Sequence, residues 1–425
     1  MTFPSREVLG RLVCGVVFVL SLGSQAQAGW IAGPPLPDPR WHLAAAASPE
    51  GTVMALGGRV LKGPERTYGY GLGTHALVFF DSKSGAWQSA PTMPPYVGRT
   101  ISVPYSKKVA EAKRAEPGWT EPPVRPSKMF AEFELPFVSA DAKGRAHFFV
   151  GFGSVFFDPR TRAWGQSEPH LHHVYPSDPN ANSFDGSQPS WRRRSAGAAA
   201  TGSDGRIYLV GGLGASATKR DSRRELVDGL DIYDPEKNVW KRGAAMRTPR
   251  QSFAASFGPN GKLYVFGGCA CRGSAPLYKA SDSAGRARVK AEAVAEERAV
   301  ASTEVYDPKT DSWSLAAPMP EPRMLMAAAR GADGKIYVIG GQRSWGSTPL
   351  SDVDVYEPAT DHWSKGPSLG IARVGHAAVT AADGTIWVLG GYAAAPESTE
   401  VVRIMADGKE GPTASVELLR TSGTH

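Results

Sequence analysis

The residues best suited to binding chemistry are five arginines at one position of an internal repeat. Each lies 17 residues before a glycine pair and precedes a run of small residues. They are Arg40, Arg194, Arg250, Arg323 and Arg373. Five guanidinium groups at one level around an axis would bind carboxylates or sulfated and sialylated sugars, because Arg pairs with such groups through two parallel hydrogen bonds. The alternative is structural, with each arginine paired to an acidic turn residue of a neighbouring repeat, because function seldom requires the same residue in every repeat.

Histidines offer a second kind of chemistry. His170, His172 and His173 are close enough in sequence to contribute imidazoles to a zinc or copper site. In the same segment only Asp178 could add a ligand, and loop histidines are common, so we expect no metal and no cofactor.

Two further histidines lie near the start of inner strands and could face the centre of the fold. They are His42 and His376, and the same positions of other repeats hold Ser252 or Met326. Because those residues share no chemistry with imidazole, a structural role is the better interpretation.

Enzymatic machinery is hard to find in this sequence. It contains no nucleophile elbow, phosphate loop, HExxH motif or pair of carboxylates at catalytic spacing. Apart from Cys14 in the N-terminal apolar stretch, the cysteines are Cys269 and Cys271, which form either a disulfide or two thiols in a loop. Catalysis is left open, and a non-catalytic role is favoured.

The elements that would position these residues form a repeat. Apolar strands that end in a glycine pair occur five times, and a degenerate version at 147–153 makes six. The pairs are Gly57 and Gly58, Gly211 and Gly212, Gly267 and Gly268, Gly340 and Gly341, and Gly390 and Gly391. Such a period indicates a repeat architecture, in which each unit buries its apolar face against its neighbours.

A hairpin follows five of the six strands. An aromatic residue ends one strand, a turn rich in Asp, Pro and Asn follows, and a tryptophan begins the next strand seven positions after the aromatic. The pairs are Phe80 and Trp87, Phe157 and Trp164, Tyr233 and Trp240, Tyr306 and Trp313, and Tyr356 and Trp363. Each unit therefore contains four strands, and six such units predict an all-β, six-bladed β-propeller.

The glycine pair, the aromatic and the tryptophan together resemble the kelch repeat over nearly the whole chain after residue 28. The second unit departs from the pattern, with Gly151-Phe152 in place of the glycine pair and Glu134 where the arginine would fall. The resemblance implies a propeller of four-stranded kelch blades, of the exported bacterial type.

The N-terminus is expected to complete the last blade. The sixth unit has a strand at 400–404 but no tryptophan after it. Trp30 precedes Arg40 by ten residues, which is also the interval from Trp240 to Arg250. The segment around Trp30 therefore supplies the outer strand of blade 6 and pairs an otherwise open edge. We assign 29–412 to the propeller and 413–425 to a C-terminal tail.

Residues 1–28 have the features of a signal peptide. Arg6 and Arg11 precede an apolar stretch at 12–22, and Ala26-Gln27-Ala28 fits the small-residue cleavage rule. The stretch is too short for a stable membrane span, so the mature protein is expected to be secreted or periplasmic. The net charge of +7 is spread along the chain without a nucleic-acid motif, and we expect no nucleic-acid partner.

A module that binds a protein or a glycan through its loops and channel mouth is the function these features favour. Long insertions at 102–128, 165–193, 213–229 and 272–300 offer variable surface. The alternative is a carbohydrate-active enzyme of the sialic acid mutarotase (epimerase) type, which this chain resembles in architecture only. Ligand identity is not encoded by the fold.

Overall fold

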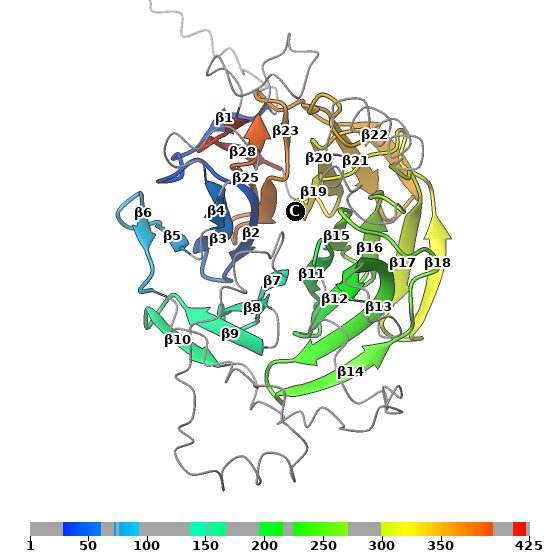
Figure 1. Cartoon of the computed structure of the whole chain (residues 1–425), viewed down its shortest axis with the longest axis horizontal. Helices are drawn as coiled ribbons and strands as arrows, with labels where there is room; N and C mark the ends of the chain where they lie inside the picture. The colour runs from blue at the N-terminus through cyan, green and yellow to red at the C-terminus, as the bar shows by residue number, and fades with distance from the viewer. Residues whose placement is uncertain are drawn as a thin grey trace, which may run out of the picture.

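Six antiparallel sheets surround a central axis in the computed structural model, so the chain is a six-bladed β-propeller (Figure 1). The structure describes residues 29–60, 72–73, 76–92, 137–150, 153–166, 195–215, 224–270, 299–393 and 411–421. The second blade is present despite its departures from the repeat pattern, which confirms the predicted blade count.

Each blade contains four strands, named here in order from the axis outward. Blade 1 contains β2 (Trp41–Ala47), β3 (Val53–Val60), β5 (Leu77–Asp81) and β6 (Ala86–Ser89), with β4 (Leu72–Gly73) extending β3. Blade 2 contains β7 (Phe137–Ala140), β8 (Ala146–Val150), β9 (Gly153–Asp158) and β10 (Ala163–Gln166). Blade 3 contains β11 (Ala198–Thr201), β12 (Ile207–Ala215), β13 (Arg224–Asp234) and β14 (Val239–Gly243).

The other three blades follow the same order. Blade 4 contains β15 (Ala254–Phe257), β16 (Leu263–Phe266), β17 (Thr303–Asp307) and β18 (Ser312–Ala316). Blade 5 contains β19 (Ala327–Arg330), β20 (Ile336–Ile339), β21 (Val353–Glu357) and β22 (His362–Lys365). Blade 6 contains β24 (Ala377–Thr380), β25 (Thr385–Leu389), β28 (Val416–Arg420) and β1 (Ile31–Ala32), and a small sheet of β23 (Arg373–Val374), β26 (Tyr392–Ala393) and β27 (Gly411–Pro412) accompanies it.

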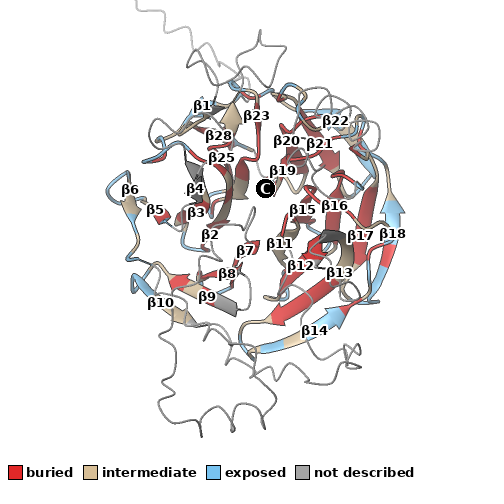
Figure 2. Cartoon of the chain, viewed as in Figure 1, coloured by how far each residue is buried: buried red, intermediate tan, exposed pale blue. Residues whose placement is uncertain are grey.

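The six inner strands contact one another in a closed ring, in the order β2, β7, β11, β15, β19 and β24. Their many alanines allow close approach at the axis, where side chains have little room. The second strand of each blade is the most deeply buried, with Val210, Leu263 and Val338 fully inaccessible to solvent. Figure 2 shows the core as a buried band between the inner strands and the exposed outer strands.

In five of the six blades the tryptophan marker connects the blade to the one before it. Tyr306 lies opposite Trp313 across the hairpin, and the indole N–H of Trp313 donates to the backbone oxygen of Ala244 in the preceding blade at 2.7 Å. Four other tryptophans donate in the same way to the preceding blade. They are Trp30 to Pro367, Trp87 to Pro34, Trp164 to Pro91 and Trp363 to Ala317. The predicted hairpin is therefore confirmed, and it also joins neighbouring blades.

The N-terminal closure of blade 6 is also confirmed, since Ile31 lies opposite Leu418 in the β1–β28 pair. The third strand of this blade is not the one expected. The segment 400–404 lies outside the described residues, and β28 occupies the position between β25 and β1. The segment 413–425 is therefore not a tail throughout. Val416 and Leu419 are 2% exposed, and their burial in the core explains why this stretch forms a strand.

Candidate functional site

The four described arginines of the expected ligand-binding ring are buried. Arg40, Arg250, Arg323 and Arg373 are each 0% exposed, and Arg194 lies outside the described residues. The four described arginines are therefore unavailable to an external ligand. These four arginines therefore do not support the mutarotase-type alternative.

Arg250 shows how such a group is held. Its Nη1 donates to the backbone oxygens of Gly267 at 2.9 Å and Ser302 at 3.1 Å, and its Nη2 donates to the carboxylate of Glu304 at 2.5 Å. Arg373 makes the equivalent contacts with Gly390, Ser415 and Glu417. Burial lowers the pKa of Arg250, and the charge of Glu304 opposes that shift.

The acidic partners come from the third strand of the same blade, which corrects the expectation of a neighbouring blade's turn. Glu304, Asp354 and Glu417 each contact the arginine of their own blade. In blade 1 the equivalent position is Val78, and Arg40 pairs instead with Asp38 at 3.3 Å. The signal for Glu304 and Asp354 is an acid two positions before the aromatic marker of the third strand, such as Glu304 before Tyr306, and these acids were not among the predicted site residues.

Glu304 also stabilises the connection between blades 3 and 4. Its two carboxylate oxygens also accept the backbone N–H groups of Arg247 at 2.8 Å and Thr248 at 3.1 Å. Those residues belong to the connection from blade 3 to blade 4, so the buried pair fixes the path between blades. Glu417 does the same for Gly370 and Ile371, which connect blade 5 to blade 6.

A chain of backbone hydrogen bonds lies two residues after each arginine. At this position His42, Ala196, Ser252 and Leu325 have φ between 54° and 56°, and Gly375 has φ of 58°. Four of these residues donate their N–H to the carbonyl of the equivalent residue in the preceding blade, at 2.7 to 3.0 Å. The chain runs from Ser252 to Ala196, Leu325 to Ser252, Gly375 to Leu325 and His42 to Gly375. His42 therefore has a structural backbone role.

His376 is buried at 6% exposure beside Gly340 of blade 5. Burial, with the nearby charge of Arg373, lowers the pKa of His376 to about 3. This histidine is a neutral core residue at neutral pH. His170, His172 and His173 lie outside the described residues. Within the described ranges, no group of three or more His, Cys, Asp or Glu side chains is placed to hold a metal ion.

Five backbone pairs at the glycine-pair end of the blades, which we call the rim pairs, frame the candidate binding surface. In each, the residue directly after the arginine lies opposite the residue directly after the glycine pair. The pairs are Trp41 and Arg59, Ser195 and Leu213, Gln251 and Cys269, Met324 and Gln342, and Val374 and Tyr392. The backbone pairing is the same in five blades, but the side chains differ in every one.

An apolar cluster occupies the rim at blades 4 to 6. Cys269, Ala299, Met324, Leu325 and Val374 form its buried part, and the half-buried rings of Trp345 and Tyr392 pack against it. The ring of Tyr392 also meets that of Trp41 edge to face, with 5.8 Å between centroids. Cys269 is disulfide-bonded, and Cys14 and Cys271 lie outside the described residues. In the part of the chain with described structure, no helix has the length and apolar character to cross a bilayer.

Comparison with known proteins identifies the repeat. A family model described as the Kelch motif matches residues 194–247, 294–320 and 323–370. An F-box/kelch-repeat protein of Arabidopsis thaliana is 35% identical over 92 residues, covering 22% of this chain and 18% of the relative. Beta-scruin of Limulus polyphemus is 32% identical over 157 residues, covering 37% and 15% respectively.

Both matches span less than a fifth of the relative's own length. The solved structure of YjhT is 18% identical to this chain, with a TM-score of 0.46, over 60% of this chain and 72% of that one. The repeat markers seen in the six blades, the family match and the two relatives agree, and the chain belongs to the kelch-repeat family.

Proposed function

We propose that this chain is an exported binding module whose ligand, a protein or a glycan, docks at the glycine-pair end of the propeller. The half-buried rings of Trp345 and Tyr392, held on the frame of the rim pairs, are the observation that supports this proposal. Five blades hold the rim pairs on the same backbone pairing, yet no two rim pairs have the same side chains. Most rim-pair side chains are themselves buried, with Gln251 at 2% and Met324 at 0% exposure, so the rim pairs supply a rigid frame. The half-buried rings beside that frame are the groups offered to a ligand.

The chemistry of the rim favours a ligand with an apolar face. Trp345 and Tyr392 are half-buried aromatics beside an apolar cluster. Aromatic rings with a few placed polar groups are typical of protein interfaces and ligand sites. Long connections also leave from this end. The β12–β13 ribbon continues past Gly211 as far as the pair of Ala215 and Arg224 before the insertion begins.

Export is supported by two observations. The first 28 residues have the order of a signal peptide, with basic residues, an apolar stretch and a small-residue cleavage site. The disulfide at Cys269 fits an oxidising compartment. The intact mass of the protein purified from its producing cells tests this directly. A mature chain that begins at Gly29 is expected, and a full-length chain in the cytoplasm would contradict export.

The docking site is tested with a photo-crosslinking residue at position 345 and, in a matched variant, at position 315. Leu315 is 62% exposed on the outer strand β18, away from the rim pairs. Crosslinks to a partner are expected from 345 and not from 315. A glycan array probed with the wild type and Trp345→Ala gives the second arm, where a loss of at least about tenfold is expected for a residue central to binding. Equal crosslinking at both positions, with no sugar bound, would overturn the proposal.

A further inference from the structure

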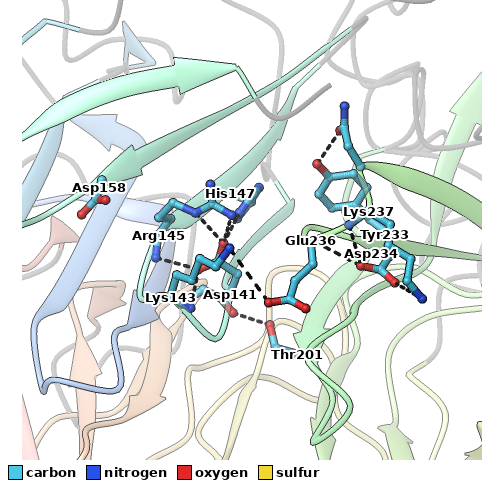
Figure 3. Close-up of polar contacts among 12 residues, drawn as sticks. Asp141, Lys143, Arg145, His147, Asp158, Thr201, Tyr233, Asp234, Glu236 and Lys237 are labelled. Carbon is cyan, nitrogen blue, oxygen red and sulfur yellow. Dashed lines mark hydrogen bonds and ion pairs between the residues drawn. The ribbon is translucent and has the colours of Figure 1, made fainter. Parts of the chain in front are cut away.

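A buried polar cluster lies between blades 2 and 3. Figure 3 shows the carboxylate of Asp141 between Arg145 and His147. The carboxylate accepts from His147 Nε2 at 2.9 Å and from Arg145 Nε at 2.7 Å. Asp141 is 4% exposed and His147 is 1% exposed, so the cluster is part of the core. We call these three residues the blade 2 cluster.

His147 occupies a position that tyrosine holds in the next three blades. It is the second residue of β8, and Tyr208, Tyr264 and Tyr337 are the second residues of β12, β16 and β20. Tyr208 donates to Asp204 at 2.6 Å and Tyr337 donates to Asp333 at 3.0 Å, each in the turn before its strand. Burial raises the pKa of Tyr208 and Tyr337, so those contacts do not change charge near neutral pH. In blade 2 the same position carries an imidazole.

The proton on His147 can be assigned from its partner. Burial by itself raises the pKa of Asp141, but hydrogen bonds from His147 and the backbone of Arg145 hold it at about 2. The ionised carboxylate can only accept, so Nε2 of His147 carries the hydrogen. Nδ1 is buried and has no hydrogen-bond partner in the described part of the chain. A second proton would have to be added at this atom.

Aromatic rings surround the imidazole of His147. The imidazole lies 6.2 Å from Phe149 and 5.5 Å from Phe156 in its own blade, and 5.7 Å from Tyr233 of blade 3, measured between ring centroids. A buried N–H without an acceptor is costly, and a charged one more so. Burial lowers the pKa of His147, the charge of Arg145 acts in the same direction, and Asp141 opposes both.

The other polar contacts across this interface are few in the described chain. Ser139 Oγ and Thr201 Oγ1 are 2.7 Å apart, and Lys143 Nζ lies 3.9 Å from Glu236 at the exposed edge. Tyr233 reaches His147 with its ring, while its hydroxyl donates to Asn238 at 2.8 Å. The charged groups facing His147 are therefore Asp141 and Arg145, and its packing against Tyr233 is one of the contacts that joins the two blades.

We propose that the contact between blades 2 and 3 is a pH-sensitive joint, which loosens in mildly acidic solution when His147 takes up a proton. Since the folded state holds His147 less basic than an exposed histidine, its contribution to stability is complete above pH 6.5 and declines as the pH falls below that value. Asp141 contributes its stabilisation above pH 3.8 and loses it only on further acidification, which lies outside this window. The joint depends on geometry in blades 2 and 3 and is independent of the proposed ligand site.

Hydrogen exchange of the full-length protein, corrected for the intrinsic pH dependence of exchange, tests the joint. Between pH 7.5 and 5.5 the protection of amides in 137–150 is expected to fall by about tenfold. The lower pH lies one unit below the pKa of an exposed histidine, about 6.5, so protonation of His147 in the open state favours opening by that factor. Amides of β16 in blade 4 are the internal control and are expected to keep their protection. In His147→Gln, which retains a donor for Asp141 but does not titrate, the difference is expected to disappear.

Three results would overturn the joint. The first is unchanged protection of 137–150 in the wild type. The second is an equal loss in β16, which would indicate global unfolding. The third is the same pH dependence in His147→Gln. Because the wild type alone can give the first two, the proposal stays testable if the variant folds poorly.

Discussion

The backbone N–H of Gly391 donates to the backbone carbonyl of Arg40 at 2.9 Å, and this bond joins the last blade to the first. The bond repeats around the ring, from Gly212 to Arg250, Gly268 to Arg323 and Gly341 to Arg373, at 2.8 to 2.9 Å. The ring is therefore closed by the same contact that joins the internal blades. Gly391 can make it because its φ of 100° suits glycine, and an added Cβ would lie 2.8 Å from the Cβ of His376.

This bond explains why arginine and glycine keep their spacing. The side chain of Arg250 bonds to the carbonyl of Gly267 in its own blade, while its backbone carbonyl accepts from Gly212 of the blade before. Arg40, Arg250 and Arg373 each connect the inner strand of one blade to two glycine turns in this way. The positions of the four described arginines follow from architecture and do not require a ligand.

The closure predicts that the N-terminal segment is important for stability. Deleting 29–38 removes β1, the Trp30 hydrogen bond to Pro367 and the buried Leu36, so a sharply lower thermal midpoint is expected. Trp30→Ala alone should cost about 2–3 kcal/mol in unfolding free energy. Ile31→Ala is the control, because Ile31 is 54% exposed and should change stability by less than about 0.5 kcal/mol. An unchanged melt of the deletion would refute the closure.

The buried ion pairs predict a contrast with surface pairs. Arg250→Ala leaves Glu304 buried and unpaired, and a loss of about 3–5 kcal/mol is expected in denaturant unfolding. Arg343→Ala is the control, because Arg343 and Glu321 pair at the surface with 54% and 41% exposure, and a loss below about 1 kcal/mol is expected. If Arg250→Ala unfolded like the wild type while ligand binding disappeared, the arginine would be a binding residue after all.

His376 predicts a pH dependence in blade 6. Its pKa of about 3 lies below the 6.5 of an exposed histidine, so its stabilisation is complete above pH 6.5 and falls as the pH approaches 3. At pH 5 the wild type should have lost about 2 kcal/mol from this group. Substitution His376→Met, which copies Met326 of blade 5, should remove that loss in urea titrations.

The reciprocal variant Met326→His should acquire a similar loss at pH 5, because the position is 6% exposed. Both variants are compared with the wild type at pH 7.5 as well, where only packing should differ. A wild type whose stability is the same at pH 7.5 and pH 5 would argue against burial of a neutral His376.

Local sequence was sufficient for the architecture. Glycine pairs, aromatic-ended strands and tryptophans keep a fixed register because each serves a short-range contact, such as Tyr306 opposite Trp313. The ten-residue interval from Trp30 to Arg40 predicted the closure for the same reason, since it repeats an interval inside the chain.

Tertiary structure decided what the repeated residues do. In sequence, Arg250 and Glu304 are 54 positions apart, and only the folded blade shows that they form a buried pair. The third strand of blade 6 is β28 and not the expected segment 400–404, and this also depends on long-range burial. Val416 and Leu419 become core residues only beside β25. The sequence by itself determined six blades and their closure, because those depend on local spacing. The burial of the arginines, the rim pairs and the packing of His147 against Tyr233 were decided by contacts between distant segments.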